Sequence, residues 1–110
     1  MKLPKGNEAV VLKTKLLEYL LSETHPVGSS KAKFFRALKF DETNTAKLTK
    51  SLLKIARDNE VKSIRKFKYG INYMIEGEIN TPSGKKVPLI TVWFAKTEKS
   101  KASFVTAYPV

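Results

Sequence analysis

Cysteine is absent from the 110-residue sequence, and histidine occurs once, as His25. The absence of cysteine excludes a disulfide framework, a thiolate zinc site and a thiol nucleophile, and it fits a reducing compartment. One histidine cannot build a metal centre that needs several. The chemistry open to this chain is therefore limited to hydroxyl, amine, carboxylate and single-imidazole groups.

Long hydrophobic runs are also missing. No apolar stretch approaches the roughly 20 residues that cross a bilayer. Lys13, Lys15 and Glu18 interrupt the segment in which a signal peptide would need an unbroken apolar core. A chain of 110 residues has room for one hydrophobic core. We expect a single domain over residues 1–110, in the cytoplasm and without membrane contact.

Acidic residues are scarce relative to basic ones. The sequence has 21 Lys and Arg but only 10 Asp and Glu, which gives a formal net charge of +11. Such an excess attracts polyanions, because each phosphate that a cation neutralises releases condensed counterions. The charge favours nucleic acid as the partner, and an acidic protein is the alternative.

Hydrophobic periodicity divides the chain into a helical first half and a strand-rich second half. The expected helical segments are a helix over residues 13–22, a short helix capped at Ser29 or Ser30, and a third helix that follows a cap within residues 41–45. The expected strands are residues 61–69, 71–79, 87–95 and 104–108, with a type I turn at 81–84. The sequence predicts an α+β fold, with N-terminal helices packed on one face of a four-stranded antiparallel β-meander.

Alternation along the last two strands predicts which face of that sheet is free. Ile90, Val92 and Phe94 share one face, and we expect this aliphatic set to pack under the helices. The side chains left on the other face are hydroxylic or aromatic: Thr91, Trp93, Thr106 and Tyr108. A face of this kind, flanked by lysines, suits phosphates and stacked bases. The alternative is that Trp93 and Tyr108 only cover the far side of the sheet.

Two glutamates, Glu76 and Glu78, share a face of the second strand. Paired carboxylates can hold Mg²⁺ in metal-dependent nucleases. No third carboxylate lies nearby in the sequence, and cross-strand ion pairs to Lys62, Lys66 or Lys68 explain the two acids more simply. We expect neither a metal nor another cofactor.

Metal-independent cleavage of RNA is the reaction that the remaining residues support. The ribose 2′-hydroxyl is the nucleophile, so the protein has to take up its proton, stabilise charge on the phosphoryl oxygens and protonate the leaving oxygen. His25 lies at a junction between helix and loop, where a scaffold can aim a side chain. The residues that could carry this chemistry are His25, Lys31, Thr91, Thr106 and Tyr108.

Three stretches carry a resemblance to a known domain. They are residues 15–35, with His25-Pro26-Val27-Gly28 and Lys31-Ala32-Lys33-Phe34-Phe35, then Thr91-Val92-Trp93, and last Val105-Thr106-Ala107-Tyr108-Pro109. They resemble a small bacterial and archaeal domain of uncharacterised function, related segments of which occur at the C-termini of contact-dependent toxins. That domain is similar to the barnase, EndoU, colicin and RelE superfamily of ribonuclease folds, in which helices precede a four-stranded antiparallel sheet.

The resemblance implies roles for particular residues. Toxins of the colicin D type cleave tRNA with a histidine, lysines and a hydroxyl-x-tryptophan pair, and His25, Lys31 and the Thr91/Trp93 pair match these. Thr106 and Tyr108 match a terminal motif of related toxin domains. This chain has threonine instead of serine before the tryptophan and lacks a second histidine, which leaves the general base open.

We therefore expect a metal-independent endoribonuclease of the toxin–antitoxin type that cleaves tRNA or another RNA. An acidic antitoxin or immunity protein would inhibit it, and the chain would be a monomer when free or bound to that inhibitor. The expected catalytic residues are His25, Lys31, Thr91 and Thr106. The expected substrate-binding residues are Lys33, Trp93 and Tyr108. The alternative is a non-catalytic RNA-binding module or a basic protein-interaction domain on the same fold.

Overall fold

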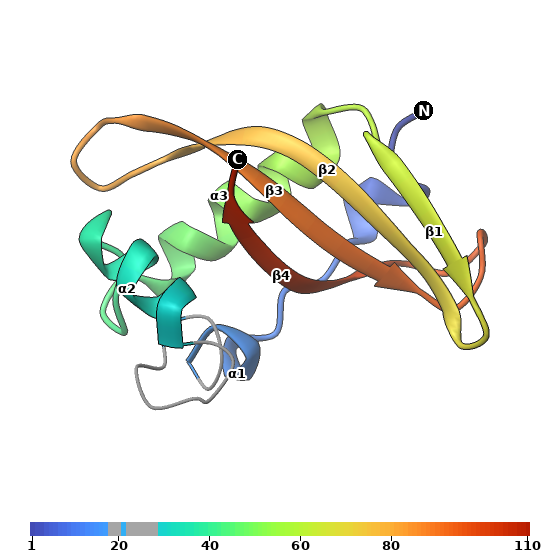
Figure 1. Cartoon of the computed structure of the whole chain (residues 1–110), viewed down its shortest axis with the longest axis horizontal. Helices are drawn as coiled ribbons and strands as arrows, with labels where there is room; N and C mark the ends of the chain where they lie inside the picture. Colours follow the sequence, from blue (N-terminus) through green and yellow to red (C-terminus); the bar gives the residue numbers. More distant parts are fainter. Residues whose placement is uncertain (18–20, 22–28) are drawn as a thin grey trace.

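The second half of the chain forms a four-stranded antiparallel sheet (Figure 1). The structure is a computed structural model, and it describes residues 1–17, 21 and 29–110. The strands are β1 (Ser63–Phe67), β2 (Gly70–Asn80), β3 (Lys86–Ala95) and β4 (Ser103–Pro109). Each strand pairs with the next along the chain, in the order β1-β2-β3-β4. The predicted meander is confirmed.

Helices precede the sheet, which confirms the predicted α+β class. They are the short 3-10 helix η1 (Gly6–Glu8), α1 (Lys13–Lys15), α2 (Ser29–Ala37) and α3 (Thr45–Asp58). The predicted helix over residues 13–22 begins at Lys13, and residues 18–20 and 22 lie outside the described part of the chain. In the described ranges, no helix has the length and apolar character needed to span a membrane.

The longest helix, α3, packs on β2 and β3 and lies behind the sheet in Figure 1. It follows Asn44, one of the predicted cap residues. Leu48, Leu52 and Ile55 are buried at helical spacing, so they form the stripe that faces the sheet. Leu53 is only partly buried, because the step from Leu52 to Leu53 turns about 100° around the helix and away from that stripe.

Gly77 in the middle of β2 sets how closely α3 approaches the sheet. A Cβ atom added there would lie 2.8 Å from Ile55 Cγ2 and 2.8 Å from Asn59 Nδ2. The Asn59 side chain is held in place, since Nδ2 donates to the Ile55 carbonyl at 3.1 Å. The absence of a side chain at this one position therefore lets the helix rest on the strand.

The helices cover the opposite face of the sheet from the one predicted. Leu89, Thr91 and Trp93 on β3 are fully buried. Leu89 and Trp93 belong to the same hydrophobic core cluster as the α3 leucines. Ile90 and Val92 point to the other face, in front of which Figure 1 shows no described helix. We call this second side of the sheet the open face. Ile90 and Val92 are nevertheless buried, at 9% and 7% exposure.

A β-bulge explains why the pattern of β4 also misled the prediction. Val92 is opposite Thr106, whereas Trp93 is opposite Phe104, so Val105 is the extra residue. The irregularity puts Phe104 on the buried face together with Ala107. Simple alternation along β4 would put Phe104 on the same face as Thr106 and Tyr108, and the bulge separates it from them.

The close contact at Gly77 gives a prediction for stability. We expect Gly77→Ala to lower the free energy of unfolding by about 1–3 kcal/mol, because the added methyl group overpacks the interface between α3 and β2. Gly6→Ala is the control, since a Cβ there meets no atom closer than 3.6 Å. Urea denaturation measures both variants, and equal destabilisation by the two would contradict the account.

Candidate functional site

Two of the predicted site residues, Thr91 and Trp93, form a hydrogen-bonded pair inside the core. Trp93 Nε1 donates to Thr91 Oγ1 at 2.8 Å. The same hydroxyl donates to the Ile75 carbonyl at 2.8 Å. Both side chains have 0% exposure. The Thr91 hydroxyl thus uses its proton within the fold, and neither side chain is on a surface that a substrate can reach.

The spacing of this pair explains the Thr-x-Trp sequence in structural terms. Residues two apart on a strand point to the same side, which brings the Thr91 hydroxyl under the Trp93 indole. The indole ring also meets Phe104 edge to face, with ring centroids 5.5 Å apart. A buried indole N–H needs an acceptor, and Thr91 supplies it.

The pair predicts a specific energetic coupling. Thr91→Val keeps the shape of the side chain but leaves the indole N–H of Trp93 buried without an acceptor. We expect the free energy of unfolding to fall by about 1–3 kcal/mol. The same substitution in a Trp93→Phe background should cost clearly less, because phenylalanine has no N–H. Urea denaturation of the four proteins in this double-mutant cycle measures the coupling, and an additive result would refute it.

Thr106 and Tyr108 lie on the open face. Thr106 is opposite Val92 and Tyr108 is opposite Ile90. Thr106 is partly buried, and Tyr108 is 37% exposed. The structure therefore brings these two residues together and separates them from Thr91 and Trp93 by the thickness of the sheet.

The predicted cations and the histidine belong to α2 and the segment before it. Lys31 and Lys33 lie in the first half of α2, where Lys31 is partly buried and Lys33 is exposed. His25 lies outside the described residues.

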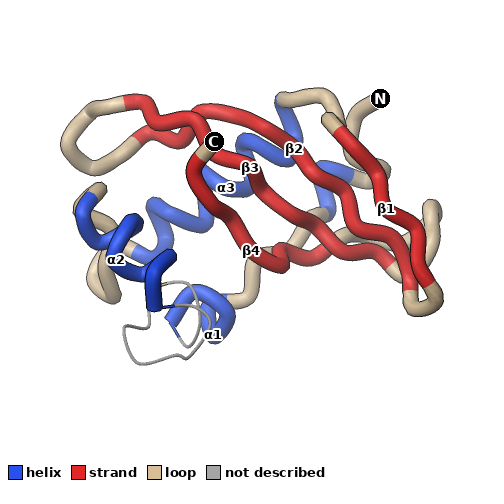
Figure 2. The backbone as a smooth tube through the Cα atoms, viewed as in Figure 1, coloured by secondary structure: helices blue, strands red, loops and turns tan. Residues whose placement is uncertain are grey.

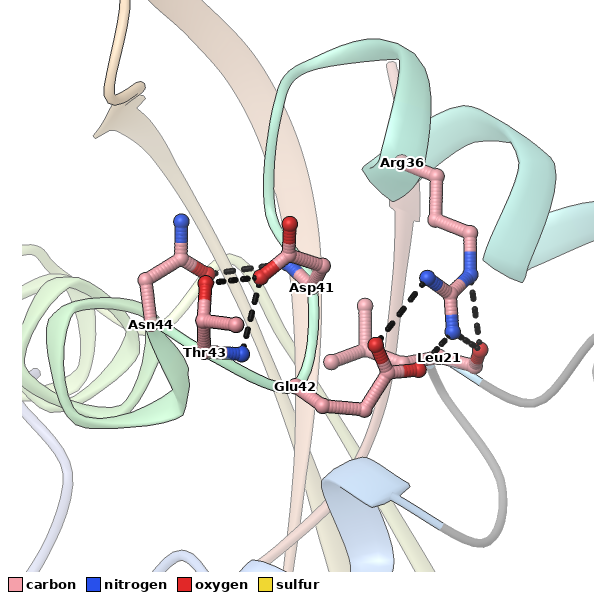
Figure 3. Close-up of polar contacts among 6 residues, drawn as sticks. All are labelled: Leu21, Arg36, Asp41, Glu42, Thr43 and Asn44. Carbon is pink, nitrogen blue, oxygen red and sulfur yellow. Dashed lines mark hydrogen bonds and ion pairs between the residues drawn. The ribbon is translucent and has the colours of Figure 1, made fainter.

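Arg36 anchors α2, a role that no sequence pattern indicates. Its Nε and Nη2 atoms donate to the Leu21 carbonyl at 3.1 and 2.8 Å. Both Nη atoms also bond the carboxylate of Glu42 (Figure 3). One guanidinium thus ties the helix that carries Lys31 and Lys33 to residue 21 and to the loop before α3.

The loop before α3 is held by its own side chains. Asp41 Oδ1 accepts hydrogen bonds from the backbone N–H of Thr43, at 2.8 Å, and from its hydroxyl (Figure 3). Asn44 Oδ1 accepts from the Asp41 N–H at 2.8 Å, and Asn44 Nδ2 donates to the Lys39 carbonyl at 2.8 Å. Hydrogen bonds from Thr43 hold the pKa of Asp41 below its ordinary value, and those from Arg36 do the same for the pKa of Glu42.

The lowered pKa of Glu42 predicts a pH-dependent contribution to stability. A carboxylate whose pKa falls on folding stabilises the fold fully above its ordinary pKa of 4.5, and this contribution is lost as the pH falls through the lowered value. We expect Glu42→Gln to have a lower urea midpoint than the parent near neutral pH. The two midpoints should converge in acid, and a difference that stays constant with pH would contradict the charge effect.

Exposed aromatic side chains gather at one end of the sheet, by the β1–β2 hairpin. The Phe67 ring lies 6.0 Å from Phe94 and 6.4 Å from Tyr69, between ring centroids. Phe67 is 41% and Tyr69 72% exposed. Lys68 Nζ is 5.7 Å from the centre of the Tyr69 ring. Rings beside cations are the groups on which single-stranded bases stack.

Two glutamates near the sheet form ion pairs with lysines. Lys62 Nζ lies 2.6 Å from Glu76 Oε1, which confirms the predicted ion-pair explanation for this glutamate. Lys66 Nζ lies 2.8 Å from Glu98 Oε1 and holds the pKa of Glu98 below its ordinary value. Among the described residues, no group of three or more His, Cys, Asp or Glu could hold a metal ion.

A cationic surface lies on the helix side of the molecule. A groove of about 540 Å³ runs along the outer side of α3 and includes Val11 and the partly buried Leu53. Its lining contains four cations and no carboxylate: Lys13, Lys50, Lys54 and Arg57. We call it the α3 groove.

Comparison with known proteins identifies the family and the fold. Residues 2–110 match the family described as a domain of unknown function (DUF6883), and the chain belongs to this family. No curated protein matches the sequence. The fold is similar to a chain of the contact-dependent growth inhibition toxin–immunity protein complex from Klebsiella pneumoniae 342, with a TM-score of 0.71 and 18% sequence identity. The similarity covers 94% of this chain and 95% of that chain.

Proposed function

We propose that this chain is a toxin-like domain that acts on RNA as a metal-independent endoribonuclease. The observation that carries the proposal is the open face, where Thr106, Tyr108 and exposed aromatic rings occur on a chain with a net charge of +11. The shared fold with a chain of a toxin–immunity complex supports the toxin class. The resemblance of the sequence to ribonuclease toxins supports RNA as the substrate, with tRNA as the first RNA to test.

The proposed reaction is attack of a ribose 2′-hydroxyl on the adjacent phosphorus. The O2′–P bond forms, the P–O5′ bond breaks, and the products are a 2′,3′-cyclic phosphate and a 5′-hydroxyl. His25 takes the 2′ proton or protonates the leaving O5′. Lys31 and the hydroxyl of Thr106 stabilise charge on the phosphoryl oxygens. Lys33 and Tyr108 bind the substrate.

Thr91 and Trp93 have a different role in this proposal from the one that the sequence predicted. Their hydrogen-bonded pair fixes the core side of β3, and the opposite side of the same strand forms the middle of the open face. We assign them to support of the sheet and not to contact with RNA.

An acidic inhibitor is the second partner that we propose. The net charge of +11 complements an acidic protein, and the α3 groove offers four cations without a carboxylate. The similar fold comes from a complex of a toxin with its immunity protein. An inhibitor of this kind would bind the chain at low salt more tightly than at high salt.

Incubation of the purified chain with total RNA in EDTA tests the activity. We expect discrete cuts whose ends are cyclic phosphates and 5′-hydroxyls. His25→Ala should reduce the rate by about 100-fold or more, because a general acid or base contributes at least that factor. Thr91→Ser, which keeps the core hydroxyl, is the control that should still cleave. Intact RNA, or equal cleavage by His25→Ala, would overturn the assignment.

A non-catalytic RNA-binding module is the second candidate function. The exposed rings of Phe67 and Tyr69 favour it, since stacking on them needs no histidine. This alternative predicts RNA binding without cleavage and an affinity that His25→Ala leaves unchanged.

A further inference from the structure

A pocket of about 360 Å³ opens at the corner where residues 10–12, the loop from β3 to β4 and the start of β4 meet. We call it the corner pocket. Its lining includes Leu12, Phe94, Lys96, Ser100, Lys101 and Ser103. Phe94 and Ser103 are opposite each other across β3 and β4. The corner pocket therefore adjoins the open face, on which the Phe94 ring lies.

The N-terminal segment forms one wall of the corner pocket, and hydrogen bonds fix it there. Val10 N donates to the Ala102 carbonyl at 3.0 Å, and Phe104 N donates to the Val10 carbonyl at 2.8 Å. These bonds make a parallel bridge between Val10 and Ser103. Leu12, two residues on, is 59% exposed at the rim.

The loop from β3 to β4 forms the other wall and is also ordered by its own contacts. The hydroxyls of Thr97 and Ser100 are 2.9 Å apart, and Ser100 N donates to the Thr97 carbonyl at 3.2 Å. Lys96 and Lys101 flank this turn and both line the pocket. The loop's glutamate, Glu98, is bonded to Lys66 on β1.

The Phe94 ring is held in a defined position at the pocket. A Cβ atom on Gly70 would lie 2.6 Å from Phe94 Cε1, so the ring rests directly on the glycine. The Phe67 ring is its neighbour on the same side, 6.0 Å away between centroids. A ring that is already fixed loses little conformational freedom when a ligand stacks on it.

We propose that the corner pocket binds one nucleotide of single-stranded RNA, away from the bond that is cut; this rests on the proposed action on RNA. The base stacks on Phe94, and Lys96 and Lys101 contact the flanking phosphates. No carboxylate lines the pocket to repel those phosphates. The strand continues over the open face towards Tyr108, which is opposite Ile90, about 13 Å along β3 from Phe94.

The α3 groove provides a control for simple charge attraction. It holds more cations than the corner pocket but its lining has no aromatic ring. Replacing two lysines in the α3 groove removes as much charge as replacing Lys96 and Lys101, but on the helix side of the sheet. A comparison of the two sites separates a defined nucleotide site from the general pull of a basic protein on RNA.

Fluorescence anisotropy with a labelled, single-stranded 2′-O-methyl RNA tests the proposal, because this RNA lacks the 2′-hydroxyl and stays intact. We expect Phe94→Leu to weaken binding about fivefold or more, the loss typical of one stacked base. Phe94→Tyr keeps the ring and should bind like the parent. Urea denaturation of both variants checks that the fold persists.

The lysines are tested as a pair. We expect Lys96→Gln with Lys101→Gln to reduce affinity and to lower the slope of log affinity against log salt by about 1.4, roughly 0.7 for each phosphate contact. Lys50→Gln with Lys54→Gln, in the α3 groove, should change affinity less than twofold. Equal losses from the two pairs, or unchanged binding by Phe94→Leu, would overturn the corner pocket as a nucleotide site.

The outcomes distinguish this site from the proposed catalysis. RNA cleavage that needs His25, with binding that ignores Phe94, would refute the corner pocket and leave the endoribonuclease proposal standing. Binding that depends on Phe94 in a chain that cuts no RNA would support the pocket and refute catalysis. A parent protein that binds no single-stranded RNA would refute the corner pocket, and the cleavage assay would decide the endoribonuclease proposal by itself.

Discussion

The hydroxyl of Thr91 lies between two partners, the indole N–H of Trp93 and the carbonyl of Ile75, at 2.8 Å from each. A tryptophan can be fully buried only if its N–H has an acceptor, and this hydroxyl provides one within the sheet itself. The largest side chain of the chain can therefore face α3 and fill the core. Because that face is occupied, the other side of β3 belongs to the open face, where Phe94, Thr106 and Tyr108 keep part of their surface exposed.

Three local features shape that surface further. Gly77 lets α3 lie close against β2 on the core face. The bulge at Val105 turns Thr106 and Tyr108 outward while Phe104 and Ala107 stay in the core. At the far end of the sheet, Gly70 makes room for the Phe94 ring. The open face is thus the side of the sheet that packing leaves away from α3, which lies behind the strands in Figure 2.

The strands and the helix order could be read from the sequence, because alternation along β2 and the leucine spacing of α3 are strong local signals. Which face of the sheet the helices cover could not be read from the sequence. A threonine two residues before a tryptophan looks like a surface pair until the hydrogen bond between them is known. Alternation of side chains along β4 also cannot reveal a bulge. Arg36 escaped prediction for a related reason, since its partners Leu21 and Glu42 lie 15 and 6 residues away. Contacts of this kind arise only in the folded chain.

The central claim is that RNA contacts the open face and not the α3 groove. Ultraviolet crosslinking of a short 2′-O-methyl RNA, with the crosslinked peptides identified by mass spectrometry, tests it most directly. The account predicts crosslinks on β3 and β4, at Phe94 and Tyr108, and on the β1–β2 hairpin at Tyr69. Crosslinks concentrated on α3, with none on the open face, would contradict it.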